Sequence, residues 1–220
     1  MKDYGLVCFD VDGTLVDNLE YSWQLFHEHF QTDKHRREDA KNKFFSGKIT
    51  YLEWANHDIG LWKEVNAKKS DFFEAIEKNN IRLMNGTEDT IKKLKQKGIK
   101  IAIISGTLNV ILDKLLPDYE NIFDYVFLSR LHFDKTGFLS GATPTEFDME
   151  GKAVALKRIA QKENIDLGRC VFIGDHHNDV KAAEEAGLSI AFNCKSDKLR
   201  NAADVVIEKK DIKEILKYVL

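Results

Sequence analysis

The sequence is poor in proline and cysteine, and its cysteines do not suggest a disulfide framework. Its 220 residues include two prolines and three cysteines. Cys8, Cys170 and Cys194 are far apart, and each lies in or beside an apolar segment, so we expect buried free thiols. Free thiols persist in reducing compartments, which predicts a cytoplasmic protein.

Long hydrophobic runs and a strong charge of either sign are also missing. No apolar run approaches the roughly 20 residues that cross a bilayer, and the start of the chain lacks the pattern of a signal peptide. The formal net charge is only −3, so we expect neither nucleic acid nor an anionic membrane surface as a partner. The sequence leaves the oligomeric state open.

From residue 86 onward, the chain contains helical segments that alternate with strand-like segments. Amphipathic stretches such as 86–98 and 152–163 alternate with short, β-branched apolar runs. This order predicts an α/β fold, a doubly wound parallel sheet of the Rossmann-like type. The expected strands are 6–9, 99–106, 125–128, 170–173, 189–192 and 205–207, with a hairpin over 132–142.

The block between the first strand and residue 86 has a different character. It is rich in charged and aromatic residues, with apolar side chains at helical spacing, such as Trp23, Phe26 and Phe30. We predict a helical insertion over residues 17–85 in a catalytic core made of residues 1–16 and 86–220.

Polar side chains follow several of the expected strands at the point where each ends. Asp10 and Asp12 follow the first strand, and Ser105, Gly106 and Thr107 end the second. Lys152 opens a helix, and the strand after that helix leads into Asp175 and Asp179. Parallel α/β sheets bind ligands beyond the carboxyl ends of their strands, so we expect these residues to share one pocket.

The residue types in this pocket suit phosphoryl transfer. Crowded carboxylates repel one another, and a hard cation with oxygen ligands such as Mg²⁺ relieves this repulsion. Ser105 can donate to a phosphate oxygen, Lys152 supplies a positive charge, and Gly106 allows close backbone approach. Asp10 could then attack phosphorus, while Asp12 protonates the leaving oxygen and later deprotonates water.

The motifs "DVDGT", "SGT", Lys152 and "GDHHND", in this order, resemble those of the haloacid dehalogenase (HAD) superfamily, and within it the phosphoserine phosphatase-like proteins. The resemblance covers residues 4–16 and 86–220 and implies that the insertion is a lid-like cap. It implies a phosphatase with Asp10 as nucleophile and Asp12 as acid/base. Asp10, the backbone carbonyl of Asp12, and Asp175 would bind Mg²⁺. The remaining implied roles are phosphate binding by Ser105, Gly106, Lys152 and Asn178, and support of the metal and the lysine by Asp179.

Departures from the family pattern concern the substrate. The position of the glutamate that holds the substrate amine aligns with Leu19, with Glu20 one residue later. No arginine occurs in the segment 47–62, where the family's carboxylate-binding arginine is expected, and Asp58 falls near its place. These departures predict a Mg²⁺-dependent phosphomonoesterase acting through an aspartyl phosphate on a small phosphorylated metabolite other than phosphoserine.

Two other functions are compatible with the same motifs. A phosphotransferase or phosphomutase would share every core residue and differ in how well the cap keeps out water. A catalytically idle binding or regulatory protein would keep the fold alone. The sequence also leaves open the role of His176 and whether the cap tryptophans, Trp23, Trp54 and Trp62, form a small core or line the substrate cavity.

Overall fold

The centre of the molecule is a seven-stranded sheet with the order β6-β5-β4-β1-β7-β8-β9. The computed structural model describes residues 3–149 and 151–220. All neighbouring strands are parallel except β6, which pairs antiparallel with β5. The strands are β1 (Leu6–Phe9), β4 (Lys100–Leu108), β5 (Tyr125–Phe133), β6 (Leu139–Thr143), β7 (Cys170–Gly174), β8 (Leu188–Phe192) and β9 (Val205–Ile207).

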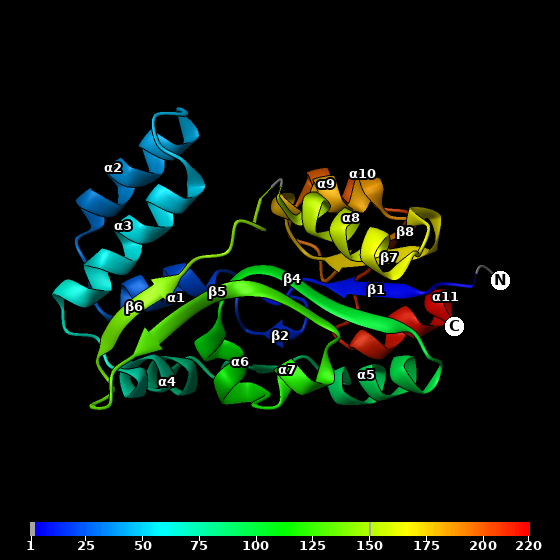
Figure 1. Ribbon diagram of the computed structural model, residues 1–220, viewed down its shortest axis with the longest axis horizontal. Coiled ribbons are helices and arrows are strands. Elements are labelled where there is room, and N and C mark those ends of the chain that lie inside the picture. The colour runs from blue at the N-terminus through cyan, green and yellow to red at the C-terminus, as the bar shows by residue number, and fades with distance from the viewer. Residues whose placement is uncertain (1–2, 150) are drawn as a thin grey trace.

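Helices cover both faces of this sheet, as a doubly wound fold requires (Figure 1). One face carries α8 (Gly151–Glu163), α9 (Val180–Glu185) and α10 (Asp197–Ala202). The other carries α5 (Thr87–Gln96), α6 (Asn109–Leu115), α7 (Tyr119–Ile122) and α11 (Leu216–Val219). Short 3-10 helices η1 (Leu167–Arg169), η2 (His177–Asp179) and η3 (Ile212–Ile215) join these elements. The predicted α/β fold class is confirmed.

Strand β1 lies at the centre of the sheet because its four residues are all apolar and fully buried. It pairs with β4 on one side and β7 on the other, so that Phe9 lies level with Ile103 and Ile173. The residues after Phe9 therefore emerge beside the carboxyl ends of both neighbours. This register brings distant motifs to one edge of the sheet.

The insertion leaves and rejoins the core through two short strands, β2 (Val16–Asp17) and β3 (Arg82–Leu83), which pair antiparallel. Its helices are α1 (Ser22–His29), α2 (Lys34–Phe45), α3 (Tyr51–Glu64) and α4 (Lys69–Lys78). Phe26 of α1 and Phe72 of α4 belong to the same buried cluster as the core strands, whereas α2 and α3 project beyond the sheet (Figure 1). The division into domains at residues 17 and 85 stays a prediction.

Several finer predictions from the sequence agree with the structure. The hairpin around Gly137 forms between β5 and β6, and Cys8, Cys170 and Cys194 are buried and unpaired. Strand β5 runs to Phe133, further than the predicted end at Leu128, because it continues into that hairpin. No helix in the described part of the chain is both long and apolar enough to span a bilayer.

Candidate active site

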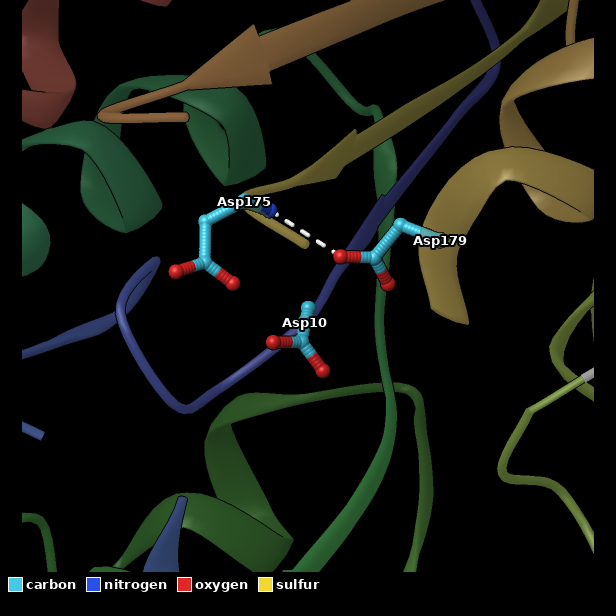
Figure 2. Close-up of side chains that lie close together, drawn as sticks. All are labelled: Asp10, Asp175 and Asp179. Carbon is cyan, nitrogen blue, oxygen red and sulfur yellow. Dashed lines mark hydrogen bonds between the residues drawn. The ribbon is translucent and has the colours of Figure 1, made fainter. Parts of the chain in front are cut away.

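Three buried aspartates meet at the carboxyl edge of the sheet. Asp10 follows β1, Asp175 follows β7, and Asp179 ends η2. Each offers a carboxylate oxygen, and these three atoms lie within 4.8 Å of one another. Figure 2 shows the three side chains lying close together, although they come from separate segments. The convergence predicted for these residues is present in the structure.

A lysine lies against the cluster. Lys152 of α8 is fully buried, and its Nζ lies 2.5 Å from Asp10 Oδ1 and 2.6 Å from Asp179 Oδ1. The other oxygen of Asp179 accepts hydrogen bonds from the backbone N–H groups of Asp175 and His176, both at 3.0 Å. Asp179 therefore fixes both the lysine and the turn that carries Asp175, which agrees with a supporting position.

The cluster is electrostatically unbalanced without a further cation. Burial raises the pKa of Asp10 well above its ordinary range, with Lys152 acting in the opposite direction. Burial, helped by Asp179, raises the pKa of Asp175 to about 7, although Lys195 Nζ lies 2.9 Å from it. Burial alone would lower the pKa of Lys152, but its two carboxylate partners outweigh burial and raise it.

This donor set fits a divalent cation with a preference for oxygen. Three buried carboxylates face two ammonium groups, so negative charge is in excess, and carboxylate oxygens are the ligands that Mg²⁺ favours. Asp10 and Asp175 each use only one carboxylate oxygen in a hydrogen bond, to Lys152 and to Lys195. Both oxygens of Asp179 already accept hydrogen bonds. Lys195, which lies beside this cluster, was not predicted from the sequence.

Asp12 turns its carboxylate away from the cluster. Its Oδ1 accepts from Thr107 Oγ1 at 2.6 Å, and its Oδ2 accepts from the backbone N–H of Ser22 at 2.7 Å. Burial raises its pKa, and these hydrogen bonds oppose the shift. A carboxyl group that is held in place and inclined to keep its proton suits a general acid. Thr107 was expected in this pocket but without a role, and Ser22 was not predicted.

The other predicted residues surround the same centre. Ser105 and Gly106 lie at the bend of β4, and Trp23 of α1 donates from Nε1 to the carbonyl oxygen of Gly106 at 2.9 Å. Asn178 of η2 donates from Nδ2 to Asp148 Oδ1 at 3.0 Å. Asp148, between β6 and α8, was not predicted from the sequence because nothing in its local pattern marks it.

A cavity of about 720 Å³ connects these groups to the cap. The cap contributes Arg37 from α2 and the aromatic side chains of Tyr21, Trp23 and Trp54. Of the three cap tryptophans, Trp23 and Trp54 therefore line the cavity, whereas Trp62 is fully buried in the core cluster. The cavity lining drawn from the core includes Asp10, Asp12, Ser105, Gly106, Asp148, Asp175, His176 and Asn178.

Comparisons with known proteins agree with this geometry. Residues 4–187 match the haloacid dehalogenase-like hydrolase family. A phosphoserine phosphatase of Methanocaldococcus jannaschii is 34% identical over 99% of both chains. One from Lactococcus lactis is 30% identical over 100% of this chain and 97% of its own. A solved structure, titled as a substrate-bound phosphoserine phosphatase complex, is 29% identical with a TM-score of 0.76 over 100% of both chains.

These full-length relatives contradict the prediction that the substrate is not phosphoserine. That prediction rested on the missing arginine in residues 47–62, which form most of α3. The neighbouring helix α2 places another arginine, Arg37, at the cavity. A charge required in a pocket can come from any helix that lines it.

The motifs at the sheet edge, the buried acidic cluster and the matches along the chain therefore lead to one classification. The chain belongs to the haloacid dehalogenase-like hydrolases and is a phosphatase of the phosphoserine phosphatase-like kind.

Proposed function

We propose that the protein is a Mg²⁺-dependent phosphoserine phosphatase that works through an aspartyl phosphate on Asp10. The observation that carries this proposal is the meeting of Asp10, Asp175 and Lys152 at one edge of the sheet, with Asp12 held on the other side of the turn. Relatives with this name match along the whole chain. A neighbour 29% identical is titled as a phospho-aspartyl intermediate analogue.

In the first step, a carboxylate oxygen of Asp10 attacks phosphorus. The bond from phosphorus to the serine oxygen breaks, and an acyl phosphate forms on Asp10. The departing serine oxygen needs a proton, and Asp12 supplies it. Its raised pKa and its fixed hydrogen bonds to Thr107 and Ser22 suit that role.

In the second step, water attacks the same phosphorus atom. Asp12, now a carboxylate, takes a proton from the water. The bond between phosphorus and the Asp10 oxygen breaks, which releases inorganic phosphate and restores both aspartates. Ser105, the backbone of Gly106, Asn178 and Lys152 are the groups that would hold the phosphoryl oxygens.

Magnesium, held by Asp10, Asp175 and the backbone carbonyl of Asp12, would keep the carboxylates ionised and neutralise charge on the phosphoryl group. We assign the carboxylate of phosphoserine to Arg37. Its guanidinium Nη1 donates to Gln24 Oε1, and its Nε lies 3.8 Å from Asp58 Oδ2, so it is oriented but keeps donors for a ligand.

A cytoplasmic location suits this function. The three cysteines are unpaired and buried, which is common in proteins of reducing compartments. The proposed partner is the small phosphorylated metabolite itself.

A panel of phosphomonoesters in Mg²⁺ tests the function. We expect phosphoserine to have the highest kcat/KM among phosphoserine, phosphothreonine, 3-phosphoglycerate, sugar phosphates and nucleotides. The Asp10→Asn protein, purified in parallel, measures contaminating phosphatases. The proposal is wrong if another ester exceeds phosphoserine, or if phosphoserine is hydrolysed no faster than in that control.

Metal binding should be stronger at pH 8 than at pH 5. Asp10 and Asp175 have raised pKa values, the latter about 7. These two groups therefore hold protons more tightly in the folded metal-free protein than in the unfolded chain, and the stability that they contribute falls as pH rises from about 4 to about 7. We expect saturating Mg²⁺ to raise Tm by about 5–10 °C at pH 8 and by clearly less at pH 5, where protons compete.

Thermal melts with Mg²⁺ and with a chelator at both values of pH measure this effect. The Asp175→Asn variant is the control and should show little response to Mg²⁺. An equal or larger shift at pH 5 would speak against metal binding by these carboxylates.

Arg37 should control affinity for the substrate. We expect Arg37→Met to raise KM for phosphoserine about 10- to 100-fold, because a charged hydrogen-bond partner of the substrate carboxylate is lost. Hydrolysis of p-nitrophenyl phosphate, which has no carboxylate, should change little. Arg36→Met is the matched control, since Arg36 precedes it on α2 and pairs with Glu64 on the surface. Equal KM values for both variants would refute the assignment.

A further inference from the structure

One carboxylate in the cavity touches the phosphate-binding turn without belonging to the metal cluster. Asp148 lies four residues before Lys152 in the segment between β6 and α8, and it lines the cavity. Its carboxylate lies so close to Gly106 that a Cβ atom added to that glycine would collide with it. Asp148 is therefore next to the groups proposed to hold the phosphoryl oxygens.

Three donors fix the position of this carboxylate. Its Oδ1 accepts from Asn178 Nδ2 at 3.0 Å and from the backbone N–H of Met149 at 2.7 Å. Its Oδ2 accepts from the hydroxyl of Tyr51 at 3.0 Å. Asn178 comes from the core and Tyr51 from α3 of the cap, so both parts of the molecule hold Asp148 in place.

A fixed negative charge is unfavourable beside a phosphate dianion unless a positive group lies near both. Lys152 lies nearby, but its hydrogen bonds go to Asp10 and Asp179 and not to Asp148. Phosphoserine carries such a group, because its ammonium nitrogen is only four bonds from phosphorus. A carboxylate in contact with the phosphate-binding turn is within reach of that ammonium.

Two other acidic side chains of the cavity already have partners within the cap. Asp58 lies 3.2 Å from His27 and 3.8 Å from Arg37, so it already has cationic or potentially cationic neighbours. Glu28 accepts a hydrogen bond from Gln24 on the cap helix α1. Neither is shown in contact with the Ser105–Gly106 turn.

We propose that Asp148 is a specificity-determining residue that binds the substrate ammonium group and repels phosphomonoesters that lack one. This inference rests on the proposed function and adds a residue to it. Discrimination would come from attraction of the zwitterionic ester together with repulsion of purely anionic ones. Tyr51 would position the carboxylate from the cap side.

The test compares two substrates that differ in one group. These are phosphoserine and 3-(phosphonooxy)propanoate, in which hydrogen replaces the ammonium group. Asp148→Asn keeps the shape and removes the charge. We expect kcat/KM for phosphoserine to fall about tenfold or more and kcat/KM for the amine-free ester to rise, so that their ratio falls by more than tenfold. Tyr51→Phe, which keeps the charge, should retain most of the ratio.

Inhibition by inorganic phosphate gives a second measurement. If a variant is inactive, its affinity for phosphate can still be measured from the change in Tm that phosphate causes. Loss of the negative charge should make phosphate bind Asp148→Asn more tightly than wild type. A parallel fall for both substrates, or weaker phosphate binding, would overturn the inference and indicate a structural role. Wild-type protein that does not hydrolyse phosphoserine would instead overturn the proposed function, so the two failures are distinguishable.

Discussion

The Asp10→Asn protein is expected to lose turnover of phosphoserine by about 10⁴-fold or more in the presence of Mg²⁺. An amide of the same shape cannot form the acyl phosphate, and loss of a nucleophile commonly costs several orders of magnitude in kcat. Spontaneous hydrolysis of phosphate monoesters is among the slowest reactions that enzymes accelerate, so background reaction will not hide the loss.

Steady-state rates with phosphoserine measure the loss, and acid quenching during turnover of radiolabelled substrate tests its cause. Wild-type protein should retain label on the chain, whereas Asp10→Asn should retain none. Asp17→Asn is a suitable control, because Asp17 pairs with Arg82 and Lys210 outside the active site. An Asp10→Asn protein with a few per cent of wild-type kcat would refute the assignment of the nucleophile.

The second large effect is expected at Lys152. Replacing it with Met leaves the buried carboxylates of Asp10 and Asp179 without their shared cation. Breaking a buried ion pair on one side typically costs about 3–5 kcal/mol. We expect the free energy of unfolding to fall by about that amount, and kcat/KM to fall at least about 10²-fold because the phosphoryl group also loses a positive partner.

Chemical denaturation and steady-state kinetics measure these two effects. Lys157→Met is the matched control, since Lys157 is on the same helix α8 and makes a surface pair with Glu185. It should change the free energy of unfolding by less than about 1 kcal/mol. A Lys152→Met protein that is as stable and active as this control would contradict the ion-pair assignment.

The sheet edge could be predicted from the sequence because its parts carry local signals. The apolar run before Asp10, the β-branched run before Ser105 and the apolar run before Asp175 each indicate a strand end. The rule that parallel strands bring their carboxyl ends to one edge then supplies the long-range step.

The substrate side of the cavity could not be predicted in the same way. Arg37 is on a helix whose sequence, "KHRREDAKNKFF", is rich in charged residues, so no periodicity distinguishes it from its neighbours. Asp148 is in an irregular segment, and its contacts with Gly106, Asn178 and Tyr51 join parts far apart in the chain. Both depend on how the cap is placed over the core, which local patterns do not encode.

The central position of β1 has a consequence for biosynthesis. Leu6 pairs with Lys100 and with Cys170, so the first strand to leave the ribosome needs partners that are translated much later. Pairings between such distant segments form slowly, because long loops must close first. A nascent chain can therefore assemble neither the acidic cluster nor its lysine until translation has passed Asp179, and it stays catalytically silent until at least 179 of its 220 residues have been made.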